Sequence, residues 1–275
     1  MEVRLIRVVR TRLERPGYTF EVRDLASHLL ALSSIAAVKS MAMPSASTDH
    51  VARLAVERVI EARVHGRYLV RAAAGAGSAG LLVGFHGYAE DAAIHLNALS
   101  AIPDIDLWLI VSVQALHPFY TKNQTVVANW MTRQDREHAM VDNVEYIGSV
   151  LEAVRTEYGV RRPLVFAGFS QGGAMAYRAA ARYPSDALII LASDVPPDIL
   201  AATPVSLPPV LIGRGTNDQW YTETRHAADL EALSALDVAV ESCVFDGGHE
   251  WGEPFYAAAA RHLRDVLGRT RSDSP

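Results

Sequence analysis

The sequence is organised around the stretch Leu164-Val165-Phe166-Ala167-Gly168-Phe169-Ser170-Gln171-Gly172-Gly173-Ala174-Met175-Ala176. Apolar residues typical of a buried strand run into the pattern Gly-x-Ser-x-Gly, and small helix-forming residues follow directly. This order predicts a strand, a sharp turn and a helix, with Ser170 at the turn. Such a turn is strained and pushes the serine hydroxyl out above the sheet, while the two flanking glycines let strand and helix cross closely. The pattern also arises by chance in flexible loops, but here the strand and helix context is present, so we predict that Ser170 is chemically active.

The length and composition are those of a globular protein. The chain has 275 residues, half of them hydrophobic, which is enough for one large domain; we expect this domain at residues 51–275, after an N-terminal extension at residues 1–50. The net charge of -5 and the lack of a dense Lys/Arg block argue against nucleic-acid binding. The single cysteine, Cys243, excludes intrachain disulfides and fits a cytoplasmic protein. No run reaches the roughly 18 apolar residues of a membrane span, so we expect no stable membrane insertion.

The first forty residues differ from the rest because basic side chains outnumber acidic ones there. Within them, a short apolar run at residues 29–38 follows the charged part. A secretory signal has this order, but here the charged part is unusually long and Lys39 stands where a small residue is needed for cleavage. Alternatively, translation starts at Met41 or Met43. The sequence leaves the role of this extension open.

Strand and helix patterns alternate along the remaining chain. They predict strands at residues 81–85, 107–113, 164–169, 187–192, 210–213 and 238–245, with helices between them and a terminal helix at residues 254–267. This alternation predicts an α/β fold with a mainly parallel central sheet, helices on both faces and ligands at the carboxyl ends of the strands. Residues 59–73 alternate in polarity around His65-Gly66 and predict an antiparallel hairpin at the N-terminal edge. Residues 114–131 lack periodicity and are expected to form a lid or pocket wall.

A serine hydroxyl needs a base to take its proton, and the base needs a carboxylate to orient it. His249 is the candidate base, because it follows the last strand in a glycine-containing loop before the terminal helix. For the acid, Asp218 and Asp194 both follow strands, whereas Asp246 lies too close in sequence to His249. We favour Asp218, because the order Ser, Asp, His with the acid after the penultimate strand is usual for this architecture.

The tetrahedral intermediate of acyl transfer carries an oxyanion, which backbone N-H groups can stabilise. One donor is expected to be the amide of Gln171, directly after the serine. The other is expected to be the amide of Tyr88, in the loop after the strand at residues 81–85. We expect the His86 ring to hold this loop by hydrogen bonding rather than to act as a base.

Four motifs in this order resemble the phospholipase/carboxylesterase family of α/β-hydrolases, the group related to acyl-protein thioesterases. They are Phe85-His86-Gly87, Gly168-Phe169-Ser170-Gln171-Gly172-Gly173, Gly215-Thr216-Asn217-Asp218 and Gly247-Gly248-His249. The resemblance covers about residues 59–267. It implies an α/β-hydrolase fold and hydrolysis of esters or thioesters through an acyl-enzyme, with no cofactor. Tyr88 departs from the family, which typically has another glycine there, and is expected to narrow the acyl pocket.

Five aromatic residues lie on the two loops nearest the predicted site, and we expect them to line an apolar acyl pocket: Phe119, Tyr120, Trp130, Trp220 and Tyr221. Aromatic side chains in loops also commonly serve only to pack the loop down. The expected function is that of a serine carboxylesterase acting on small to medium acyl esters. A lysophospholipase or acyl-thioesterase is the alternative, and a catalytically silent binding module is a third. The expected partner is a small-molecule ester, with no metal; a homodimer is left open.

Overall fold

A computed structural model describes residues 58–74, 80–160, 162–202 and 204–272. The N-terminal extension predicted for residues 1–50, the apolar run within it and the two alternative start methionines lie outside these described residues. Among the described helices, none combines the length and the apolar character needed to cross a membrane.

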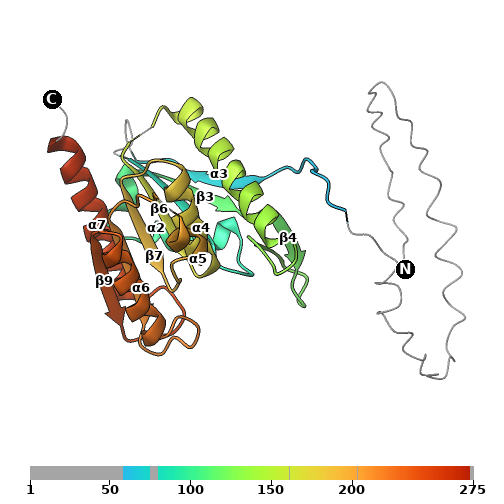
Figure 1. Ribbon diagram of the computed structural model, residues 1–275. Helices are drawn as coiled ribbons and strands as arrows, with labels where there is room; N and C mark the ends of the chain where they lie inside the picture. Colours follow the sequence, from blue (N-terminus) through green and yellow to red (C-terminus); the bar gives the residue numbers. More distant parts are fainter. Residues whose placement is uncertain (1–57, 75–79, 161, 203, 273–275) are drawn as a thin grey trace, which may run out of the picture. The chain divides into compact units, whose positions relative to one another are not determined.

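The described chain is built on one seven-stranded sheet with the strand order β1-β3-β2-β6-β7-β8-β9 (Figure 1). Its strands are β1 (Arg67–Arg71), β2 (Gly80–Phe85), β3 (Trp108–Gln114), β6 (Leu164–Phe169), β7 (Ala187–Leu191), β8 (Val210–Gly215) and β9 (Val240–Phe245). Only β1 is antiparallel, to β3, and all other neighbours are parallel. Five strands of this sheet, β2, β3, β6, β7 and β8, are buried along their whole length, which explains why the sequence shows them as continuous apolar runs.

The helices are α2 (Ala92–Ser100), α3 (Arg136–Tyr158), α4 (Gln171–Arg182), α5 (Pro197–Ala201), α6 (Glu223–Ala235) and α7 (Glu253–Ser272), with a short 3-10 turn at Ile105–Leu107. The connection through α2 runs from β2 to β3, and the connections through α3, α4 and α6 run the opposite way across the sheet. Because such crossovers are right-handed, α2 covers one face and α3, α4 and α6 cover the other. The α/β fold with a mainly parallel sheet, predicted from the sequence, is confirmed.

The predicted N-terminal edge hairpin is wrong. Only its second half forms a strand, β1, which pairs with β3 from Arg67 opposite Gln114 to Arg71 opposite Ile110. Residues 58–66 contain no strand, and the apolar side chains that suggested one are in solvent, with Ile60 89% and Val64 62% exposed. An alternating pattern yields a stable strand only if its apolar face is buried, and among the described residues none covers that face.

The segment predicted to lack structure, residues 114–131, is also more regular than expected. It contains β4 (His117–Tyr120) and β5 (Val126–Asn129), which pair as an antiparallel hairpin separate from the main sheet. An isolated bridge between Glu90 and Ala128 ties this hairpin to the loop after β2. Each strand is only four residues long and β4 contains Pro118, which explains why no clear period is visible in the sequence.

The long helix α3 begins at Arg136, after Asp135 in a left-handed conformation with φ 49°. It ends before Gly159, whose φ of 71° is the left-handed conformation that glycine adopts readily at helix ends.

Candidate active site

Ser170 lies at the junction of β6 and α4 with φ 51° and ψ -122°, a conformation that is costly for a residue with a side chain. The flanking glycines make this junction sterically feasible. A Cβ at Gly168 would lie 2.4 Å from the carbonyl oxygen of Gly172, and a Cβ at Gly172 would lie 2.0 Å from the carbonyl oxygen of Phe85. Neither position can hold a side chain. The sharp turn between strand and helix that the sequence predicts therefore depends on both glycines.

The three residues selected from the sequence form one chain of hydrogen bonds. The Oγ atom of Ser170 is 2.8 Å from Nε2 of His249, and Nδ1 of the same ring is 2.8 Å from Oδ2 of Asp218. The ring of Phe169 lies 5.0 Å from the His249 ring, between centroids, and restricts where the imidazole can move. The imidazole therefore contacts a hydroxyl on one side and a carboxylate on the other.

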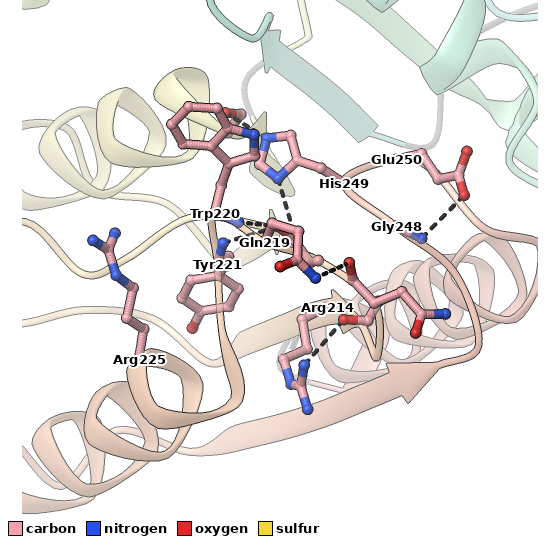
Figure 2. A network of polar contacts seen from close by, with 12 residues as sticks. Arg214, Gln219, Trp220, Tyr221, Arg225, Gly248, His249 and Glu250 are labelled. Atoms are coloured by element: carbon pink, nitrogen blue, oxygen red, sulfur yellow. Dashed lines mark hydrogen bonds and ion pairs between the residues drawn. The ribbon is translucent and has the colours of Figure 1, made fainter.

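Asp218 is held in place by its own loop. It is 4% exposed, and its Oδ1 atom accepts hydrogen bonds from the amides of Trp220 at 2.8 Å and Tyr221 at 2.9 Å. Figure 2 shows this loop next to the one that carries Gly248, His249 and Glu250. Two backbone donors stabilise the carboxylate as an anion and leave its second oxygen for the imidazole.

The two competing aspartates have other partners. Asp194 is exposed and forms an ion pair with Arg225 at 3.0 Å. Asp246 accepts a hydrogen bond from the side chain of Asn217 at 3.2 Å. Of the three candidates considered in the sequence, the structure brings only Asp218 to His249.

The two backbone amides predicted as oxyanion donors, those of Tyr88 and Gln171, have no hydrogen-bond acceptor within the part of the chain that the structure describes. Backbone N-H groups near the start of a helix are commonly free in this way and can bind an anion. Both amides are therefore available to an oxygen of a ligand.

The buried side chain of His86 holds the loop that carries Tyr88. The His86 ring accepts a hydrogen bond from the Ala115 amide at Nε2, 3.1 Å away, and its Nδ1 atom donates to the Gly87 carbonyl at 2.7 Å. Burial lowers the pKa of His86 in spite of this bond to Gly87, so the ring stays neutral. The prediction that this ring supports the loop by hydrogen bonding agrees with these contacts.

Glu90 also supports this loop, and the sequence reasoning did not single it out. Its Oε2 atom accepts a hydrogen bond from the Gly87 amide at 2.7 Å. Burial raises the pKa of the Glu90 carboxyl, while this hydrogen bond and the nearby His249 act against the shift. The only signal in the sequence was an acidic residue three positions after Gly87, which is also a common turn pattern.

The side chain of Gln171 has a role that the sequence did not suggest. Its Oε1 atom accepts a hydrogen bond from the Trp130 amide, and its Nε2 atom donates to the Met131 carbonyl, both at 2.9 Å. These bonds fix the segment after β5 against the start of α4. Gln171 therefore connects the serine turn to the segment that follows β5.

A cavity of about 280 Å³ opens at Ser170 and His249. Of the five aromatic residues predicted to line an acyl pocket, Trp220 and Tyr221 lie in its wall, and Phe119, Tyr120 and Trp130 do not. The last three are placed differently because residues 114–131 fold back as a hairpin. The wall is also more polar than predicted, since it includes three arginines and Asp194.

The three aromatic residues that do not line the cavity, Phe119, Tyr120 and Trp130, lie elsewhere. Trp130 is fully buried and donates from Nε1 to the His86 carbonyl at 2.8 Å. The Phe119 ring lies 5.6 Å from the Tyr88 ring, between centroids, and Tyr120 is 68% exposed. Tyr88 is itself 59% exposed, and it is not part of the cavity wall, so the predicted narrowing of the acyl pocket by its side chain is wrong.

Within the described residues, no group of three or more His, Cys, Asp or Glu side chains is placed to hold a metal ion. Ser170 is hydrogen-bonded to His249, and His249 is hydrogen-bonded to Asp218. This arrangement can move a proton from the hydroxyl to the imidazole while the carboxylate stabilises the resulting positive charge.

Comparisons with known proteins identify the fold. No protein-family model matches the chain, and no curated protein matches its sequence. Among solved structures, esterase PE8 is 23% identical with a TM-score of 0.62, covering 74% of this chain and all of that one. A carboxylesterase of Bacillus cereus is 15% identical with a TM-score of 0.59, covering 73% of this chain and 94% of that one. Acyl-protein thioesterase 2 of Zea mays is 17% identical with a TM-score of 0.59, covering 74% of this chain and all of that one.

These neighbours agree with the resemblance inferred from the four motifs. Their low sequence identity means that they identify the architecture, and they leave the chemistry of this chain to its own residues. The chain has the α/β-hydrolase fold of solved carboxylesterases and acyl-protein thioesterases.

Proposed function

We propose that this protein is a serine carboxylesterase that hydrolyses small to medium acyl esters through an acyl-enzyme. The observation that carries the proposal is the pair of 2.8 Å hydrogen bonds that joins Ser170 to His249 and His249 to Asp218, at a strained turn beside a cavity. The structural neighbours include an esterase, a carboxylesterase and an acyl-protein thioesterase, which supports the same class of reaction.

The mechanism follows from these contacts. His249 takes the proton of the Ser170 hydroxyl through Nε2 as Oγ attacks the ester carbonyl carbon, and Asp218 stabilises the imidazolium. The free amides of Gln171 and Tyr88 stabilise the oxyanion, with a contribution of roughly 3 kcal/mol per donor. His249 then gives its proton to the leaving alcohol, and in the second half it activates the water that releases the acid and restores the serine.

The size of the cavity favours small substrates. Its volume of about 280 Å³ lies at the lower end of the roughly 300 to 1,000 Å³ common for small-molecule sites. An extended acyl chain would not fit in it. This favours a carboxylesterase over the lysophospholipase and acyl-thioesterase alternatives, which need a longer apolar groove.

The test is hydrolysis of 4-nitrophenyl esters from acetate to palmitate by the full chain. We expect the highest kcat/KM for short and medium acyl chains. Ser170→Ala should lower kcat by about 10⁶ without changing the fold, because the nucleophile is lost. Circular dichroism of both proteins controls for folding. Substantial turnover by the folded Ser170→Ala variant would remove Ser170 as the nucleophile, and a preference for palmitate would favour the lipid-directed alternatives.

A further inference from the structure

The cavity beside Ser170 is lined by cations from three different helices. Arg136 comes from the first turn of α3, Arg178 from the middle of α4 and Arg225 from the first turn of α6. Ser170 and His249 lie in the same wall. In Figure 2 the Arg225 side chain extends from α6 beside the segment that carries Trp220 and Tyr221. Guanidinium groups separated by up to 89 positions in the sequence are thus gathered around one small space next to the serine.

Two of these arginines have carboxylate partners. Arg225 pairs with Asp194 at 3.0 Å. Arg178, 5% exposed, binds Asp198 through two donors, with Nε 2.8 Å from Oδ2 and Nη2 2.6 Å from Oδ1. Burial opposes the charge on Asp198, but its hydrogen bonds and the positive charges of Arg178 and Arg136 outweigh this and lower its pKa. The two aspartates therefore offset two of the three positive charges.

The third positive charge, that of Arg136, has no such partner. No ion pair to Arg136 is found in the part of the chain described, although its charge acts on Asp198. Among the residues that line the cavity, three arginines therefore stand against one carboxylate, that of Asp194, and Arg136 is the arginine for which the described chain offers no ion-pair partner. A net positive cavity with low-dielectric walls attracts an anion.

The paired arginines also keep unused hydrogen-bond donors. A guanidinium has five N-H donors. The Nη1 atom of Arg178 has only distant acceptors, the Ala174 carbonyl at 3.5 Å and two methionine sulfurs at 3.8 and 3.9 Å. In Arg225, only Nη1 is hydrogen-bonded to Asp194. Donors therefore remain on both groups for the oxygens of a ligand.

Resting on the proposed esterase function, we propose that the natural substrate is an ester that carries a carboxylate, bound in this cavity by Arg136 together with Arg178 and Arg225. One guanidinium without an ion-pair partner in the described chain, that of Arg136, matches a monoanion such as a carboxylate better than a phosphate dianion. The cavity volume of about 280 Å³ restricts the substrate to a compact molecule, with the anionic group close to the ester bond. Charged hydrogen bonds of this kind select both the charge and the orientation of a substrate.

The experiment measures kcat/KM for two matched pairs of esters with the full-length protein. The first pair places the charge on the acyl side, mono-4-nitrophenyl adipate against 4-nitrophenyl hexanoate. The second pair places it on the alcohol side, 4-acetoxybenzoate against 4-acetoxybenzamide. We expect the anionic member of at least one pair to be preferred by about tenfold, as expected for charged hydrogen bonds. The ratio within a pair is independent of how much of the enzyme is active.

The variant Arg136→Gln should lower this ratio by about threefold to tenfold, because its exposed guanidinium is the one available to pair with the carboxylate of the substrate. Arg182→Gln is the matched control. It removes one charge from the exposed end of α4, outside the cavity wall, and should keep the wild-type ratio.

The possible outcomes separate this proposal from the esterase proposal. A preference for the neutral ester in both pairs, or an Arg136→Gln ratio equal to that of the wild type, overturns the carboxylate assignment and leaves the esterase intact. Hydrolysis of all four esters that is no faster in the wild type than in Ser170→Ala overturns the esterase function itself.

Discussion

The loops that follow β7 and β8 make an instructive comparison. Each leaves the carboxyl end of a buried parallel strand at the same edge of the sheet, and each contains an aspartate that the sequence offered as the partner of His249. In the β8 loop, Asp218 is buried, bound by two backbone amides and 2.8 Å from the imidazole. In the β7 loop, Asp194 is exposed and pairs with Arg225.

The difference shows that a position after a strand is not enough to define a carboxylate's role. The chain after Asp218 turns back so that the amides of Trp220 and Tyr221 point at its Oδ1 atom. Such an oriented, buried carboxylate can stabilise a neighbouring positive charge far better than one in solvent. In the β7 loop no comparable amide pair holds Asp194, so its carboxylate faces the guanidinium of α6 instead.

A third aspartate links the two loops. Asp229 of α6 is buried, and its Oδ2 atom accepts a hydrogen bond from the Tyr221 hydroxyl at 2.8 Å. Its Oδ1 atom accepts one from the Val195 amide at 3.2 Å. The loops after β7 and β8 are therefore fixed to a common carboxyl group, which holds both sides of the cavity in place.

The sharpest test of the comparison is Asp218→Asn. An asparagine can present its NH₂ group to Nδ1 of His249, which would stabilise the wrong tautomer. We expect kcat to fall by on the order of 10⁴ with little change in KM. The measurement is steady-state hydrolysis of 4-nitrophenyl butyrate, with the thermal midpoint as the folding control. A loss of less than tenfold would show that Asp218 is not the orienting acid.

The carboxyl group of Asp229, which links the two loops, predicts that the free energy of unfolding depends on pH. Burial raises the pKa of Asp229 from 3.8 to about 6, although the hydrogen bonds from Tyr221 and Val195 oppose the shift. Because the folded state binds this proton more tightly than the unfolded state, the group's stabilising contribution is full below about pH 4. It is lost as the pH rises through about 6, with a change on the order of 2 kcal/mol.

Urea unfolding at pH 4.5 and pH 7 measures this effect. Asp229→Asn should gain stability relative to the wild type as the pH rises between these values, since it has no proton to release. Asp142→Asn, which removes an exposed carboxylate from α3, is the control and should keep the wild-type pH dependence. Equal pH dependence of wild type and Asp229→Asn would contradict the raised pKa.

The smallest effect is expected for Asp194→Asn. Its exposed ion pair with Arg225 is worth at most about 1 kcal/mol, so kcat/KM for a neutral ester should change by less than about threefold. The contrast with Asp218→Asn, measured with the same substrate, is the direct test of the comparison. A loss approaching that of Asp218→Asn would mean that the β7 loop supplies the acid and that the comparison is wrong.

The sequence supported most of the fold and the central residues of the site. The buried parallel strands were visible because both of their faces are covered, which leaves continuous apolar runs in the sequence. Two segments outside the buried strands were harder to predict. The hairpin at residues 59–73 was wrong because alternation is also compatible with an exposed segment. The hairpin at residues 114–131 was missed because each of its strands is only four residues long.

Local pattern by itself determined the turn at Ser170, since Gly168 and Gly172 leave no room for a side chain. It also singled out Ser170, His249 and two candidate acids, Asp218 and Asp194, because each follows a recognisable strand. Only the tertiary structure decided between Asp218 and Asp194, and only it gathered Arg136, Arg178 and Arg225 around the serine. The physical reason is that charge pairing and cavity walls depend on distances across loops and helices, whereas strand, turn and helix patterns depend on neighbours in the chain.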